Sequence, residues 1–218
     1  MSLLDQPRLR DLLSRLHAQA KATDAKTQVE ERALEAASAG SVDQQKLVEI
    51  WDRSYLTMAP EVGRLLYLLV RSRRPKVAVE FGTSFGISGI HIAAALHDNN
   101  FGRLITTELS AGKAASAAKN FEEAGLSKWV EIRQGDAFQT LAGVKDIDLL
   151  VLDGWKPMYY PMLKQLEPAL SPGCLIFADD TIGMADEMQD YLSYVRDPAN
   201  GYVSCGIPLD DGFELSIR

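Results

Sequence analysis

From Lys76 onward, short apolar segments alternate with helical segments, and this alternation constrains the fold more than any other feature of the chain. A strand, a helix and a second strand form a βαβ unit, and repeated units build a parallel sheet covered by helices. The expected strands are 77–81, 103–108, 129–134, 148–152 and 174–178. The expected helices between them are 87–97, 111–124, 158–168 and 184–196.

The end of the chain breaks this alternation. Residues 201–207 and 213–217 read as two strands joined by a turn at Pro208 to Gly212, which predicts an antiparallel hairpin. The fold class that we predict is therefore α/β. It is a Rossmann-like, doubly wound, mostly parallel seven-stranded sheet that finishes in an antiparallel hairpin.

The first 75 residues carry helical patterns and no strand signals. Ser41 to Asp43 is typical of a cap before a helix at 44–55, and Pro60 opens another helix that ends before Pro75. We expect residues 1–55 to form a helical extension for acceptor or dimer contacts, and residues 56–218 to form the main domain. Apolar side chains recur at helical spacing at Leu9, Leu12, Leu13 and Leu16.

Charge and composition exclude several classes of function. Residues 76–218 carry 20 acidic and 11 basic side chains, which disfavours nucleic acid as a partner. No apolar stretch approaches the ~20 residues that span a membrane, and Met1 to Arg10 lacks a secretion signal. The two cysteines, Cys174 and Cys205, form no disulfide framework. We expect a cytoplasmic protein.

A glycine turn connects the first strand to the first helix of the alternating region. Gly82, Gly86 and Gly89 follow Val77 to Phe81, and such a turn lets a ligand approach the backbone and the free N–H groups of the helix. The spacing differs from the dinucleotide motif. Glu80 would repel a pyrophosphate, so a nicotinamide oxidoreductase is disfavoured, whereas a ligand that carries an amine is favoured.

Two further strands of the alternating region also end at acidic residues. Glu108 ends the second strand, where a carboxylate can accept hydrogen bonds from both hydroxyls of a ribose. Asp136 and Ala137 follow the third strand, where an adenine would lie. Together with Glu80, these residues indicate a ligand that contains an amine, a ribose and an adenine, as S-adenosylmethionine does.

A second group of acidic residues follows the fourth and fifth strands. Asp153 ends one, and Asp179 with Asp180 ends the other. Adjacent parallel strands end side by side, so these carboxylates should converge, and they would repel one another unless a cation lay between them. Oxygen ligands suit Mg²⁺, Mn²⁺ or Ca²⁺. Lys156 follows Asp153 closely and, when partly desolvated, could act as a base towards a phenol.

These motifs resemble the cation-dependent catechol and caffeoyl-CoA O-methyltransferases, over about residues 56–218. The resemblance implies S-adenosylmethionine and a divalent cation, Mg²⁺, as cofactors. It also implies a small catechol-like or phenolic acceptor and a homodimer. Lys156 would be the general base, with Asp153 beside it, and Asp153, Asp179 and Asp180 would hold the metal. The residues implied around the cofactor are Met58, Glu80, Gly82, Ser84, Ser88, Glu108, Asp136, Ala137 and Asp153.

The chain departs from the family pattern at two positions near the acceptor. Asp180 stands where the family usually has Asn, and Gly154 stands where the animal catechol enzymes have His. Asp180 adds a negative charge at the metal position. Two alternatives therefore stay open: a metal-independent small-molecule methyltransferase, and a non-catalytic protein that binds S-adenosylmethionine.

Overall fold

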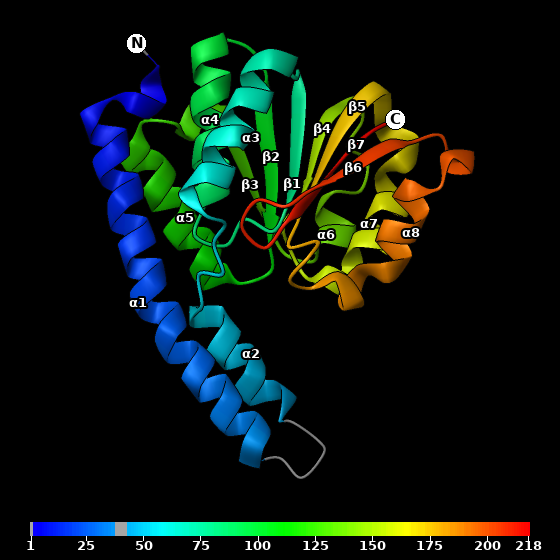
Figure 1. Cartoon of the computed structure of the whole chain (residues 1–218). Coiled ribbons are helices and arrows are strands. Elements are labelled where there is room, and N and C mark those ends of the chain that lie inside the picture. Colours follow the sequence, from blue (N-terminus) through cyan, green and yellow to red (C-terminus); the bar gives the residue numbers. More distant parts are fainter. Residues whose placement is uncertain (1, 38–42) are drawn as a thin grey trace.

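The alternating region forms one sheet in the computed structural model, which describes residues 2–37 and 43–218 (Figure 1). In this described part the strand order is β3-β2-β1-β4-β5-β7-β6, with β7 antiparallel to both of its neighbours. The predicted fold class is thereby confirmed. The strands are β1 (Val77–Phe81), β2 (Arg103–Glu108), β3 (Val130–Gln134), β4 (Ile147–Leu152), β5 (Leu170–Asp179), β6 (Val203–Ile207) and β7 (Phe213–Ile217).

Helices cover both faces of the sheet, with α3, α4 and α5 on one side and α6, α7 and α8 on the other (Figure 1). Side-chain alternation along β1 explains both layers, since Ala78 packs into one hydrophobic cluster while Val77 and Val79 pack into the other. These helices are α3 (Pro60–Arg73), α4 (Ile87–Asn99), α5 (Ala111–Ala124), α6 (Ala137–Thr140), α7 (Tyr159–Leu166) and α8 (Gln189–Arg196).

Several element bounds differ from the prediction. Helix α7 ends at Leu166 because Pro168 lies in the following 3₁₀ turn, and proline cannot donate the next helical hydrogen bond. The start of the helix predicted at 184 is also a 3₁₀ turn, Ala185–Met188. Helix α6 was not predicted, since a helix of four residues is too short to show a hydrophobic period.

The N-terminal part is dominated by one long helix. Helix α1 (Pro7–Ala37) runs along the α3–α5 side and continues past the sheet, where α2 (Gln44–Arg53) packs against it (Figure 1). Asp43 caps α2 by accepting hydrogen bonds from Gln45 and Lys46, whereas Ser41 lies outside the described residues. None of the described helices is both long and apolar enough for a membrane span. The predicted leucines of α1 are buried: Leu9, Leu12, Leu13 and Leu16.

Strand register brings the predicted site residues to one edge of the sheet. Phe81 of β1 lies beside Thr107 of β2 and Leu152 of β4, and Leu152 lies beside Ala178 of β5. Each of these strands therefore ends at the same level. The acidic residues predicted at these strand ends share the carboxyl edge, where open parallel sheets bind their ligands.

Candidate functional site

The glycine turn after β1 is built so that only glycine fits its first position. Gly82 has a φ of +102°, and a Cβ there would lie 2.4 Å from the backbone oxygen of Asp153. The turn therefore packs directly against the chain that leaves β4, and this close approach requires glycine. Gly86, with a φ of +85°, caps the start of α4.

Glu80 is a fully buried carboxylate with one unsatisfied oxygen. Its Oε2 accepts a hydrogen bond of 2.6 Å from Thr106, but its Oε1 has no hydrogen-bond partner. Burial raises the pKa of Glu80 to about 7, although nearby Thr106 and Ser88 oppose the shift. An orphaned buried carboxylate oxygen is costly in an isolated protein. It fits a ligand group that donates hydrogen bonds and carries positive charge.

Glu108 already has hydrogen-bond partners within the protein. Its Oε2 accepts from the backbone N–H of Ser84 at 2.8 Å, and its Oε1 accepts from that of Ser110 at 2.9 Å. The carboxylate thus ties the glycine turn to the end of β2. Asp136 caps α6 by accepting from the N–H of Phe138 at 2.9 Å, and the neighbouring Ala137 is buried.

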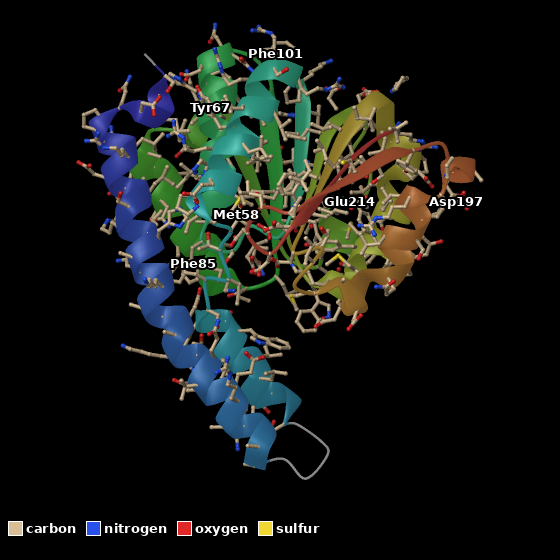
Figure 2. The ribbon with its side chains drawn as sticks, in the orientation of Figure 1. Met58, Tyr67, Phe85, Phe101, Asp197 and Glu214 are labelled. Carbon is tan, nitrogen blue, oxygen red and sulfur yellow. The ribbon has the colours of Figure 1, made fainter. Side chains whose placement is uncertain are left out.

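A loop before α3 covers this part of the site, and it contains Met58, which the sequence analysis placed around the cofactor. Asp24 of α1 accepts hydrogen bonds from the backbone N–H groups of Tyr55 and Leu56, at 2.7 and 3.0 Å. The Tyr55 ring stacks on Phe85 with 3.8 Å between centroids. Met58 itself is buried. Met58 and Phe85 lie towards the lower end of the α3–α4 side in Figure 2.

The cleft between this loop and the glycine turn is small. Its volume is only about 10 Å³, and its lining residues include Tyr55, Thr83, Ser84, Ser88 and Asp153. The other end of the loop is also held, because Asp210 accepts a hydrogen bond of 3.0 Å from the N–H of Ala59. The loop is therefore fixed at both ends beside this cleft.

The second group of acidic residues converges on Lys156. Its ammonium lies 2.7 Å from Oδ2 of Asp180 and 4.0 Å from Oδ1 of Asp153, and it donates a hydrogen bond of 2.9 Å to the Tyr159 hydroxyl. Lys156 and Asp179 are both buried. The structure therefore brings together the four residues Asp153, Lys156, Asp179 and Asp180, as predicted from the strand ends.

Charge repulsion and burial shift the titration of this group. Burial raises the pKa of Asp179 to about 7, and repulsion from Asp180 adds to the shift. The pKa of Asp153 is also raised, first by burial and then by Asp179. Burial alone would lower the pKa of Lys156, but Tyr159, Asp153 and Asp180 raise it above its ordinary value. Lys156 is therefore an ammonium in this arrangement.

The donor set matches a divalent cation in its chemistry, since three carboxyl groups gather beside one ammonium, and a cation would relieve the burial and repulsion that raise the pKa values of Asp153 and Asp179. Across residues 2–37 and 43–218, no three histidine, cysteine or acidic side chains are already set around one point as ligands. The Lys156 ammonium lies among the carboxylates instead. A cation bound there would compete with it for Asp180.

Gly154 and Trp155 shape the surface beside Lys156. A Cβ on Gly154 would lie 2.7 Å from the ring of Phe81, which explains why no larger residue occupies this position. Trp155 is 47% exposed and packs on Trp51 of α2, with 4.5 Å between ring centroids. Trp51 is held by a hydrogen bond of 3.0 Å to Glu31 of α1. Sequence reasoning missed Trp51, which is far from this motif along the chain.

The chain is similar in sequence to known methyltransferases. Residues 79–181 match the family described as "Methyltransferase domain". The chain is 37% identical to a catechol O-methyltransferase from Niastella koreensis over 58% of this chain and 59% of the relative. It is 29% identical to catechol O-methyltransferase B from Danio rerio, over 74% of this chain and 65% of that protein. The chain thus spans about three fifths of the length of these curated relatives.

A solved structure extends the likeness to three dimensions. The O-methyltransferase TomG from Streptomyces achromogenes, involved in tomaymycin synthesis and solved in complex with SAM, is 26% identical. It superposes with a TM-score of 0.65, covering 77% of this chain and 83% of that one.

Proposed function

Because the chain belongs to the S-adenosylmethionine-dependent O-methyltransferases of the catechol and caffeoyl-CoA type, we propose that it transfers a methyl group to a hydroxyl of a small catechol-like or phenolic acceptor. The observation that carries this proposal is Glu80, a buried carboxylate whose Oε1 has no partner beside the glycine turn.

Glu80 would bind the amine of S-adenosylmethionine, since an ammonium supplies both the hydrogen bond and the charge that Oε1 lacks. Gly82, Ser84, Ser88 and Met58 would surround the methionine part. Glu108 would hold the ribose, while Asp136 and Ala137 would face the adenine and Asp153 the methyl-donor end. The bound cofactor supplies a methyl group on a positively charged sulfur, which an oxygen nucleophile can attack.

We also propose a divalent cation, Mg²⁺, held by Asp153, Asp179 and Asp180. Such a cation would lower the pKa of an acceptor hydroxyl. The excess of buried carboxylate in this cluster supports the proposal.

Lys156 would take the proton of the acceptor, because it is the ammonium beside Asp153 and Asp180. Tyr159, Asp153 and Asp180 raise the pKa of Lys156, so a cation that binds these carboxylates would favour the neutral amine that a base needs. Trp155 and Trp51 would form an aromatic wall against which an acceptor ring packs, because Trp155 directly precedes Lys156 and packs on Trp51. Most of the rate would then come from positioning the acceptor oxygen towards the methyl group.

One observation favours a metal-independent enzyme as the second candidate. The Lys156 ammonium already lies 2.7 Å from Asp180 and neutralises part of the cluster. Activity towards a panel of catechols and monophenols, measured with EDTA and after Mg²⁺ is restored, separates the two. Loss of activity in EDTA and recovery with Mg²⁺ supports the metal, whereas full activity after chelation overturns it. Cofactor binding with no turnover of any acceptor would indicate a non-catalytic protein.

The assembly and location are also proposals. Val29 and Val48 are 65% and 58% exposed on α1 and α2, which supports a homodimer formed through residues 1–55. Sedimentation velocity should then give a dimer, and Val29→Glu should convert it to a monomer.

Cys174 and Cys205 are both free, which agrees with a reducing, cytoplasmic location.

A further inference from the structure

A second cavity lies on the α1 side of the molecule, away from the carboxyl edge of the sheet. Its volume is about 350 Å³, and it is bordered by α1, the start of α3 and the first turns of α4. No residue of the glycine turn or of the acidic cluster lines it. This volume lies within the range of small-molecule sites, roughly 300–1,000 Å³. The lining side chains used below are Leu4, Leu13, Arg10, Arg64, His17 and His91.

Two imidazole groups line this cavity, the buried His91 and the half-buried His17, and the proposed methyl transfer uses neither. Nδ1 of His91 donates a hydrogen bond of 2.9 Å to the carbonyl of Ile87, which leaves its Nε2 as an acceptor. The His91 ring is fixed against α3, since a Cβ on Gly63 would lie 2.6 Å from it. Nε2 of His17 is buried and has no hydrogen-bond partner.

Both rings are neutral near pH 7. Burial lowers the pKa of His91 to about 4, and burial also lowers the pKa of His17, although Glu61 opposes the latter shift. A neutral imidazole with a free nitrogen accepts a hydrogen bond from an O–H or N–H group. The cavity therefore presents acceptors in its interior, where an unpaired polar atom is costly.

The outer part of the cavity is basic and its walls are partly apolar. Arg10 and Arg64 are both exposed, and Leu4 and Leu13 are buried. Arg64 donates two hydrogen bonds of 3.2 Å to Oδ1 of Asp5, whereas Nε of Arg10 lies 3.8 Å from Oδ1 of the neighbouring Asp11. A guanidinium recognises a carboxylate through paired hydrogen bonds. The lining side chains are thus basic at the surface of the cavity, and apolar or able to accept hydrogen bonds in its interior.

We propose that this cavity is a second binding site, which takes a single-ring hydroxylated aromatic carboxylate. The carboxylate would lie on Arg10 and Arg64, the ring would pack on Leu4 and Leu13, and the hydroxyl would donate to a histidine nitrogen. This assignment does not depend on the proposed methyl transfer, because it uses none of the same residues.

The chain has only three histidines, so imidazole ¹⁵N NMR can test the proposal on the full protein. The probe is 4-hydroxybenzoate, titrated at pH 7.5 into protein labelled on histidine. We expect saturable shifts of the His17 and His91 nitrogens, while His97 stays fixed as an internal control. The imidazole signals are assigned by the loss of one set of signals in each of the variants His17→Phe and His97→Gln, and the remaining set belongs to His91. Two results overturn the proposal. In the first, the His17 and His91 signals do not shift up to the solubility limit of the probe. In the second, another signal of the protein shifts to saturation while these two stay fixed.

Variants test the chemistry of the site. Arg10→Gln should weaken 4-hydroxybenzoate binding by about tenfold, whereas Arg8→Gln, on the same helix near Gly125, should leave it unchanged. 4-Hydroxybenzyl alcohol, which lacks the carboxylate, should bind at least about tenfold more weakly. Equal binding of the alcohol, equal binding of inorganic phosphate, or equal effects of the two arginine variants would each contradict the proposed site. Circular dichroism confirms that each variant is folded.

Discussion

The two halves of the carboxyl edge treat buried charge in opposite ways. After β1, the carboxylate of Glu80 is fully buried and its Oε1 has no partner within the protein. After β4 and β5, the carboxylates of Asp153 and Asp180 lie 4.0 and 2.7 Å from the Lys156 ammonium, which the chain itself provides. The first half thus depends on a ligand for its counter-charge, whereas the second has an internal cation. Binding and chemistry should therefore respond separately to mutation.

The largest expected effect is on chemistry at the β4–β5 half. Lys156→Ala should lower kcat by about 10²–10⁴-fold, the usual contribution of a general base, and leave the Kd for S-adenosylmethionine within about threefold. Steady-state kinetics and calorimetry measure the two quantities. Lys145→Ala, an exposed lysine before β4, is the matched control. A Lys156→Ala enzyme with normal kcat removes this residue as the base.

The next effect is on stability and comes from the β1 half. The pKa of Glu80 is about 7 in the folded protein and near 4.5 when unfolded, so the folded state holds this proton more tightly. Stability should therefore fall as pH rises from about 4.5 to 7, and stay level above, by roughly 3 kcal/mol for this group.

Glu80→Gln removes this titration, so the measurement is the difference between variant and wild type in urea unfolding at pH 5 and pH 8. The variant should gain stability relative to wild type at the higher pH, without cofactor. Asp179 titrates with the same sign but is common to both proteins, and it cancels in the difference. A difference that does not change with pH would show that Glu80 does not titrate in this range.

Cofactor affinity sharpens the comparison further. Glu80→Gln should weaken S-adenosylmethionine binding by about ten- to a hundredfold, because it loses a charged hydrogen-bond partner, while kcat at saturating cofactor changes little. Glu122→Gln, exposed on α5, serves as control. Calorimetry gives the Kd, and unchanged affinity in Glu80→Gln would break the assignment of the amine.

The smallest expected effect concerns the loop that covers the β1 half. Asp24→Ala removes two hydrogen bonds to the backbone of Tyr55 and Leu56. The cofactor should dissociate about three- to tenfold faster in stopped-flow measurements, in line with the net ~0.7–1.4 kcal/mol of such bonds. Asp11→Ala on the same helix should have no effect. Equal dissociation rates in both variants would mean that Asp24 does not hold the loop.

The ends of the strands were predictable because apolar strand segments alternate with helical segments along the sequence. The register of the parallel strands then places the acidic residues that follow them at one edge of the sheet. Glu80, Glu108, Asp153 and Asp179 were all found in this way. The Asp24–loop contact and the Trp51–Trp155 pair were not, because both depend on how a long helix lies against a distant part of the chain. The Lys156–Asp180 pair also depends on side-chain placement, which no local pattern encodes.

The central claim is methyl transfer at this edge, and one assay tests it most directly. S-adenosylmethionine with a ¹³C-labelled methyl group is incubated with catechol, Mg²⁺ and the wild-type or Lys156→Ala protein, and the products are analysed by mass spectrometry. The account predicts labelled O-methylcatechol from the wild type and a strongly reduced amount from Lys156→Ala. Wild-type protein that binds the cofactor yet yields no labelled ether from catechol or any other phenol in a broad panel would contradict it.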